Sequence, residues 1–295
     1  MNILSVSGAL PSGSLRDPCI DLWLSAGYRM TVSDRSYFPK IDDPEIDLIL
    51  LRPQEIPRYI AEGSLDFGIC GYDCILECNA EDQVVELAEL VFSKVTRAPL
   101  RWVVAVPIDS PIREVADLDR KRIDTEFVFM TQRWLQSKQI QADLRFSWGT
   151  TEVKPGRGFC DAIVEATETG GSLERNNLRE VAEVCRSTPR FIAGRKAFDD
   201  PWKREKMEDI ALMLRSTLDA EGKEGLKMNA RRIDSERIIA FVPALRKPTV
   251  ASLSDPDWVS IETIVEETVV REIIPKLKRA GAEGIVTFPI QKLIL

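Results

Sequence analysis

The chain has 295 residues, a formal net charge of −7 and 0 histidines. This length is sufficient for two or three domains, each with its own core. Acidic and basic residues are interspersed, so we expect no nucleic-acid partner. The sequence contains neither a membrane-length apolar run nor a signal-peptide pattern, so we expect a cytoplasmic protein with no membrane association. The lack of histidine excludes mechanisms that need an imidazole as a base, metal ligand or pH switch.

The first hundred residues alternate between strand and helix patterns. Residues 3–7 are typical of a strand, residues 8–15 of a loop, and Asp17 and Pro18 begin a helix that ends at Gly27. Further strands are predicted at 48–51, 65–71 and 102–107, a helix at 55–62, and a helical or extended segment at 84–91. This alternation predicts a mostly parallel sheet, whose strand-to-helix loops are common ligand sites.

The pattern continues beyond residue 100. Strands are predicted at 122–123, 144–146, 181–187 and 190–193, with helices at 128–136 and 203–220. We therefore expect an α/β catalytic core of two lobes, as in periplasmic binding proteins, with a ligand cleft between them. Lobe I would comprise residues 1–97 and 186–221, and lobe II residues 98–185.

Residues 222–295 have a different pattern. Strands are predicted at 226–228, 250–253, 259–265 and 284–288, and helices at 234–245 and 269–280. The order βαββαβ is that of a ferredoxin-like domain. This region shows no phosphate loop and no clustered acids, so we assign it to regulation or assembly.

Three of the six cysteines, Cys70, Cys74 and Cys78, follow one another at a four-residue spacing. A metal or redox cluster would need a second group of ligands or a Cys-x-x-Cys pair, and neither is present. We therefore expect these cysteines to be small buried residues along a helix in a reducing compartment.

Residues 160–173 are the stretch most suggestive of chemistry. A short apolar strand carries Asp161 and Glu165 and is followed by a tight loop and a helix start. The loop has the sequence Thr169, Gly170, Gly171, Ser172. Glycine amides and hydroxyls in such a loop form a phosphate site. Carboxylates beside it suit sugar hydroxyls or Mg²⁺, so a phosphorylated ribose that carries pyrophosphate matches the whole stretch.

Several separated motifs, in the same order, resemble the long form of the ATP phosphoribosyltransferases, which has a C-terminal regulatory domain. The most specific motifs are residues 161–165 with 169–173, preceded by 151–153. Supporting motifs are residues 52–57, 65–71 with Asp73, 121–123, and 248–249 with 255–259. The likeness covers essentially the whole chain.

This resemblance implies transfer of a 5-phosphoribosyl group from phosphoribosyl pyrophosphate to N1 of ATP, the first step of histidine biosynthesis, with Mg²⁺ required. It implies that Glu165 and Asp161 hold the ribose hydroxyls and that Glu152 lies near the reacting groups. It further assigns phosphoribosyl pyrophosphate to Thr169, Gly170, Gly171, Ser172 and Leu173, and ATP to Ser12, Arg52, Gly71 and Asp73. It identifies no protein ligand for the metal.

The resemblance also implies regulation and assembly. Members of the family bind histidine between subunits, and Asn229, Leu245 and Thr249 stand at matching positions. Histidine is therefore expected as a feedback inhibitor. Dimers that associate into a hexamer are the expected assembly.

Four residues depart from the family pattern. Ser12 stands where many relatives carry Lys, Asp124 where many carry Ala, Glu165 where many carry Asp, and Lys247 where a small residue is usual. The lost cation at Ser12 could weaken polyphosphate binding, and Asp124 could repel a polyphosphate.

The sequence leaves two alternative functions open. The acids followed by a Thr-Gly-Gly-Ser loop also resemble type I phosphoribosyltransferases, which lack both the two-lobed order and the C-terminal βαββαβ unit. A two-lobed small-molecule binding or sensor protein without turnover is the second alternative. Its periplasmic form would need an export signal, so the enzyme is favoured.

Overall fold

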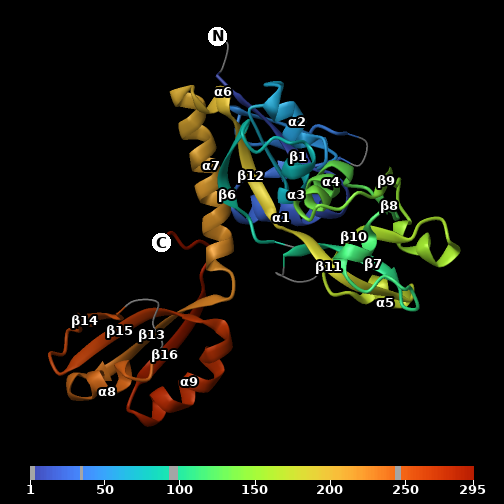
Figure 1. Cartoon of the computed structure of the whole chain (residues 1–295). Helices are drawn as coiled ribbons and strands as arrows, with labels where there is room; N and C mark the ends of the chain where they lie inside the picture. Colours follow the sequence, from blue (N-terminus) through green and yellow to red (C-terminus); the bar gives the residue numbers. More distant parts are fainter. Residues whose placement is uncertain (1–3, 34–35, 93–98, 243–246) are drawn as a thin grey trace. The chain divides into compact units, whose positions relative to one another are not determined.

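The computed structural model describes residues 4–33, 36–92, 99–242 and 247–295. The chain forms two compact units, Met1–Arg215 and Ser216–Leu295 (Figure 1). Within the described ranges, no helix combines the length and the apolar composition that a membrane crossing requires.

The described part of the first unit contains two five-stranded sheets, with the orders β4-β1-β5-β12-β6 and β11-β7-β10-β8-β9. The first sheet consists of β1 (Val6–Pro11), β4 (Ile46–Leu51), β5 (Phe67–Gly71), β6 (Val84–Glu89) and β12 (Pro189–Gly194). The second consists of β7 (Leu100–Pro107), β8 (Arg122–Thr125), β9 (Asp143–Phe146), β10 (Ala162–Thr167) and β11 (Leu178–Ser187). A small ribbon pairs β2 (Met30–Thr31) with β3 (Lys40–Ile41).

The helices of this unit are mostly short. They are α1 (Arg16–Ser25), α2 (Ile56–Ala61), α3 (Tyr72–Glu77), α4 (Val128–Ser137), α5 (Gly171–Arg175) and α6 (Arg195–Phe198). The 3-10 turns are η1 (Gly13–Leu15), η2 (Val115–Leu118), η3 (Thr151–Val153) and η4 (Pro155–Arg157). The long helix α7 (Pro201–Ala220) begins in the first unit and ends in the second.

The two sheets confirm the predicted two-lobed core. The chain leaves the first sheet after β6, forms the second sheet, and returns from β11 to β12. The prediction of mostly parallel strands is confirmed, because four of the five described strands in each sheet run in one direction and only β12 and β7 are reversed. In the first sheet β1, β4 and β5 are parallel, whereas β12 runs antiparallel to β5 and β6. In the second, β8, β9 and β10 are parallel and β7 is antiparallel. Strands that carry the chain directly from one sheet to the other, without a crossover helix, need not be parallel to their neighbours.

The first strand is longer than predicted, because the predicted loop at residues 8–15 begins with four strand residues. Gly8 pairs with Leu48 in β4, and a Cβ at Gly8 would lie 2.1 Å from the Phe67 ring. The Phe67 ring also stacks on Phe191 at a centroid distance of 5.2 Å. Gly8 is therefore explained by close packing of an aromatic core and not by a turn.

The second unit confirms the ferredoxin-like prediction. Its strands are β13 (Lys223–Arg231), β14 (Thr249–Ser252), β15 (Trp258–Glu266) and β16 (Glu283–Pro289), and its helices are α8 (Ser235–Ile239) and α9 (Glu267–Arg279), with a 3-10 turn at Arg232–Asp234. The sheet order is β14-β15-β13-β16, and all its pairs are antiparallel. Both helices cover one face of the sheet, where Leu226 and Ile261 meet Ile238 and Leu277 (Figure 1). The helix predicted at 234–245 ends at Ile239 as far as the chain is described.

Candidate active site

A cavity of about 260 Å³ in the first unit is lined from both sheets. Parallel strands bring their carboxyl ends to one edge of a sheet, where open α/β folds bind ligands. The lining comes from η1, from the ends of β4 and β5, from the start of α3, and from β7, β10 and the β8-to-α4 and β11-to-β12 connections. Its members include Ser14, Leu15, Pro53, Gln54, Gly71, Asp73, Trp102, Glu126, Phe127, Glu165, Glu168, Ser187 and Thr188.

Asp73 is held at the wall of this cavity by donors from two strands, β7 and β11. Its carboxylate accepts hydrogen bonds from the Trp102 indole at 2.6 Å and from the Ser187 hydroxyl at 2.8 Å. Asp73 is only 5% exposed, so these donors replace most of its water contacts. Trp102, on β7, and Ser187, at the end of β11, both belong to the second sheet, so Asp73 joins the two lobes.

Glu165 on β10 is half-buried and also lines the cavity. Burial raises the pKa of its carboxyl group, and the nearby carboxylates of Glu152 and Glu126 raise it further. The Ala166 backbone N–H donates to Oε1 at 3.1 Å and, with the Thr151 hydroxyl, lowers this pKa. Glu152 and Glu165, both predicted from the sequence, are thus brought close enough to interact.

Glu126 is a cavity residue that the sequence reasoning missed. Burial raises the pKa of its carboxyl group, the charge of Arg52 lowers it, and the Gln54 amide donates to Oε1 at 3.2 Å. Arg52 itself is exposed at the end of β4. Ser12 follows β1, and its N–H donates to the Leu51 carbonyl at 2.7 Å. Ser14 and Leu15, rather than Ser12, line the cavity.

The predicted phosphate loop follows β10. Gly170 has a φ of +81°, which favours glycine, and its N–H donates to the Thr167 hydroxyl at 2.8 Å. Thr169 is exposed, and Gly171 and Ser172 are half-buried. The Leu173 side chain packs in a core cluster, so only its backbone could contact a ligand.

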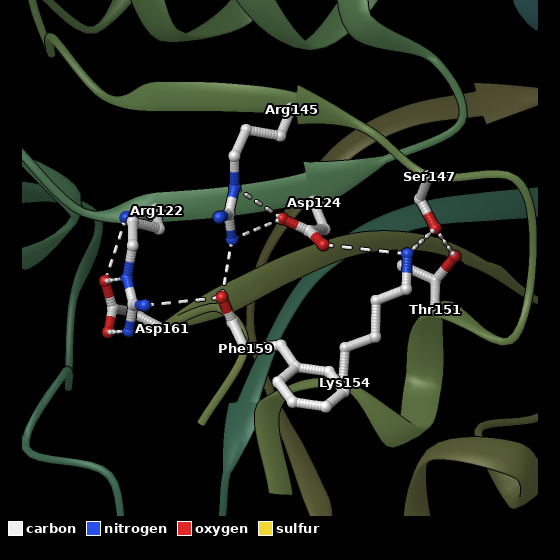
Figure 2. A network of polar contacts seen from close by, with 8 residues as sticks. All are labelled: Arg122, Asp124, Arg145, Ser147, Thr151, Lys154, Phe159 and Asp161. Atoms are coloured by element: carbon white, nitrogen blue, oxygen red, sulfur yellow. Dashed lines mark hydrogen bonds and ion pairs between the residues drawn. The ribbon is translucent and has the colours of Figure 1, made fainter. Parts of the chain in front are cut away.

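A network of polar contacts connects β8 and β9 with η3 and with the segment that leads into β10 (Figure 2). The Arg122 guanidinium donates to both oxygens of Asp161, at 3.1 and 2.8 Å, and the Arg122 backbone N–H donates at 2.9 Å. These contacts lower the pKa of Asp161 to about 2. Asp161 is not among the residues that line the cavity, so the structure does not bring it together with Glu165 there.

Asp124 lies in the same network (Figure 2). It is 7% exposed, and its carboxylate lies 2.8 Å from the Arg145 guanidinium and 3.6 Å from the Lys154 ammonium. The expectation that Asp124 repels a polyphosphate is therefore not supported, because two cations compensate its charge. Sequence reasoning missed both cations. Asp124 and Arg145 are paired across the parallel strands β8 and β9, which no local motif reveals.

The described residues do not form a metal site of their own. Among the described residues, no group of three or more His, Cys, Asp or Glu could hold a metal ion.

Burial raises the pKa of the Cys70 and Cys74 thiols well above the usual value, which suits packing and not reactivity. The predicted burial of these two cysteines is confirmed, although Cys70 lies on β5 and not on the helix.

The predicted regulatory residues lie in the second unit. Thr249 and Lys247 line a surface pocket of about 290 Å³, together with Glu262 and the last three residues of the chain. Asn229, on β13, is not among the lining residues. Leu245 lies outside the described residues.

Comparisons with known proteins agree with this architecture. The profile of the ATP phosphoribosyltransferase family matches residues 52–216, and that of the HisG C-terminal domain matches residues 220–292. The ATP phosphoribosyltransferase of Chlorobaculum parvum is 49% identical over 99% of this chain and 98% of its own length. That of Chlorobium luteolum is 50% identical over 97% and 96%, respectively.

A solved structure has a similar fold over much of this chain. One chain of the solved ATP phosphoribosyl transferase (HisG:HisZ) complex from Thermotoga maritima is 27% identical in sequence and superposes on this chain with a TM-score of 0.61. The match covers 71% of this chain and 96% of that one. The chain thus belongs to the long-form ATP phosphoribosyltransferase family and catalyses the first step of histidine biosynthesis, the transfer of a 5-phosphoribosyl group from phosphoribosyl pyrophosphate to N1 of ATP.

Proposed function

We propose that the cavity and the loop after β10 form the reaction centre, and that Glu165 connects the two substrates there. The observation that carries this proposal is the position of Glu165: it lines the cavity and lies on the strand that leads into the loop. A carboxylate accepts hydrogen bonds from neighbouring sugar hydroxyls. Glu165 would therefore hold the ribose, while the amides and hydroxyls of Thr169, Gly170, Gly171 and Ser172 and the Leu173 amide bind its 5-phosphate.

The ATP side of the site would lie at the ends of β4 and β5. The exposed Arg52 guanidinium is available to a triphosphate, and Gly71 and Asp73 form the wall of the cavity. The Oε1 atom of Gln54 is buried without a hydrogen-bond partner among the described residues, which would suit an amino group such as that of adenine. We place Ser12 beside this region, with less contact than a lysine would make.

The reaction depends more on the placement of the two substrates than on proton transfer. The bond between C1 of the ribose and pyrophosphate can break early, which leaves a cationic sugar for N1 of adenine to meet from the opposite face. N1 of adenine is unprotonated at neutral pH, so no strong base is required. Carboxylates at Glu165 and Glu152 would stabilise the positive sugar, and fixed geometry would supply much of the rate.

We propose that Mg²⁺ enters with the substrate phosphates. The described residues offer no cage of three acids, and Mg²⁺ commonly binds substrate phosphates with only one or two carboxylates. Oε2 of Glu168, a cavity residue, is buried and has no hydrogen-bond partner among the described residues, so this carboxylate fits the role. The ion would neutralise negative charge on the departing pyrophosphate.

The test is a steady-state assay with ATP, phosphoribosyl pyrophosphate and Mg²⁺, with pyrophosphatase added, that follows N1-phosphoribosyl-ATP by its ultraviolet absorbance. We expect Glu165→Gln and Thr169→Ala to raise the KM for phosphoribosyl pyrophosphate about 10-fold or more, because each removes a hydrogen bond to a charged group. The Kd for ATP, measured by calorimetry, should stay within about 2-fold. An unchanged KM in both variants, with the fold intact, would contradict the assigned roles.

We also propose that histidine inhibits the enzyme through the second unit. Thr249 and Asn229 stand at positions where the family binds histidine, and Leu245 would be the third such residue. Inhibition by histidine that is lost in Thr249→Ala, with uninhibited activity retained, would support this role; equal inhibition of both proteins would contradict it. Dimers that assemble into hexamers in the cytoplasm complete the proposal, and the assembly can be tested by light scattering.

A further inference from the structure

Lys154 begins a chain of polar contacts that leads to Glu165. Its ammonium donates to the Ser147 hydroxyl at 2.6 Å, and the Ser147 hydroxyl lies 2.6 Å from the Thr151 hydroxyl (Figure 2). The Thr151 hydroxyl is also near enough to the Glu165 carboxylate to lower its pKa. Ser147 and Thr151 are at most 1% exposed, so water does not compete strongly for these hydroxyls.

The chemistry of the groups fixes the direction of this chain. An ammonium has only donors, so the Ser147 oxygen must accept from Lys154. The single hydrogen of Ser147 is then available to Thr151, and the hydrogen of Thr151 to Glu165, whose carboxylate only accepts. A lysine at one end and a carboxylate at the other thus orient both hydroxyls, and each bond polarises the next.

The position of Lys154 is itself fixed. The buried Asp124 carboxylate lies 3.6 Å from the ammonium and is held on its other side by Arg145. The backbone carbonyl of Phe159 accepts a 2.6 Å hydrogen bond from the same arginine. Lys154 is therefore restrained by a buried acid whose charge is already compensated, so loss of the lysine would not leave Asp124 without a cation.

We propose that Lys154 is a positioning residue for Glu165, acting through the hydroxyls of Ser147 and Thr151. This inference rests on the proposed role of Glu165 as the carboxylate that holds the ribose. The lysine fixes the direction of the Thr151 hydrogen bond and so holds the Glu165 carboxylate in place beside Glu152 and Glu126, two acids that would otherwise repel it. The substrate affected is phosphoribosyl pyrophosphate and not ATP.

The test is a set of single variants and a double-mutant cycle. We expect Lys154→Met and Thr151→Val each to raise the KM for phosphoribosyl pyrophosphate about 5-fold, with less effect on the KM for ATP. Thr151→Ser keeps the hydroxyl and should restore the wild-type KM. Lys138→Met, on an exposed lysine that follows α4, is the matched control for loss of a lysine and should change neither constant.

The cycle combines Lys154→Met with Glu165→Gln. If the lysine acts through Glu165, the double variant should be no worse than Glu165→Gln alone, because the group being positioned is already gone. Multiplied effects of the two substitutions would overturn the inference, as would a Thr151→Ser variant as impaired as Thr151→Val. An unchanged KM in Glu165→Gln would instead contradict the role of Glu165 itself. Circular dichroism and thermal unfolding of each variant identify any that fail to fold.

Discussion

The indole N–H of Trp102 donates a 2.6 Å hydrogen bond to the buried carboxylate of Asp73, and this bond joins the two sheets of the first unit. Asp73→Asn would place an amide where two donors, Trp102 and Ser187, now point at carboxylate oxygens. We expect it to lower the free energy of unfolding by about 1–3 kcal/mol, because one buried donor loses its acceptor. Urea unfolding measures this loss.

Trp102→Phe provides the partner variant, because it removes the N–H and keeps an aromatic ring against Phe127. Its effect should not add to that of Asp73→Ala, which removes both acceptor oxygens, since both substitutions then remove the same bond. Strictly additive losses in the double variant would show that the bond contributes nothing to stability.

Position 71 requires a glycine, because the Asp73 side chain lies against its backbone. A Cβ at this position would lie 2.1 Å from Oδ1 of Asp73 and 3.1 Å from the Ser187 hydroxyl. We expect Gly71→Ala to lower the free energy of unfolding by about 1–3 kcal/mol through overpacking, and to weaken ATP binding because the cavity wall moves. Gly156→Ala is the matched control, since a Cβ there meets nothing within 4 Å, and its thermal midpoint should match the wild type. Equal midpoints for the two variants would refute this explanation.

The parts of the fold that sequence could predict are those set by local pattern. The βαββαβ order of the second unit follows from strand and helix periodicity, and all six elements are present. Alternation of strands and helices predicted the shared direction of four strands in each sheet of the first unit. It did not reveal that the chain passes directly between the sheets, from β6 to β7 and from β11 to β12, which is where the two reversed strands lie. The early end predicted for β1 shows the same limit: Gly8 is a turn signal by type, but Phe67, far along the chain, decides its role.

For the candidate site too, the sequence predicted the residues of a local motif and missed those that are brought together by folding. Glu165 and the loop with Gly170 lie in one continuous motif, and the structure places them on one strand and the turn after it. Glu126 and Lys154 were missed because their importance arises from strand pairing and burial, which bring together residues that are distant in sequence. Asp124 was misjudged for the same reason, since Arg145 faces it from the neighbouring strand.

Glu77, at the end of α3, caps the first turn of α4 from another lobe. Its two oxygens accept the backbone N–H groups of Phe129 at 3.1 Å and Met130 at 2.8 Å, which no side chain of α4 itself satisfies at the N-cap. Glu77→Ala should cost about 1–2 kcal/mol of unfolding free energy, as for loss of an N-cap. Glutamine keeps one acceptor oxygen for the two N–H groups, so we expect Glu77→Gln to cost less than Glu77→Ala.

Glu81→Gln is the control for Glu77, because Glu81, in the turn after α3, also contacts α4 but through the half-exposed Arg133. Exposed ion pairs contribute about 0–1 kcal/mol, so its unfolding midpoint in urea should change little. A loss in Glu81→Gln as large as in Glu77→Ala would indicate that charge across the lobes matters, rather than satisfied N–H groups.

Asp161 gives a prediction about pH, because the Arg122 guanidinium lowers its pKa to about 2. An unfolded Asp titrates near a pKa of about 3.9, so the carboxylate contributes stability above about pH 4, and this contribution is lost as pH falls toward 2. Asp161→Asn should therefore be less stable than the wild type at pH 7, by about 1 kcal/mol or less because the pair is partly exposed.

Urea unfolding at pH 7 and at pH 2.5–3.5 should show this difference shrinking with acid, whereas a difference independent of pH would contradict the linkage to Arg122. The same variant tests whether Asp161 also contacts the ribose, which remains a prediction from the family resemblance. Both oxygens of Asp161 are engaged by Arg122, so we expect Asp161→Asn to raise the KM for phosphoribosyl pyrophosphate much less than Glu165→Gln does. An equal increase would mean that Asp161 leaves Arg122 when the substrate binds.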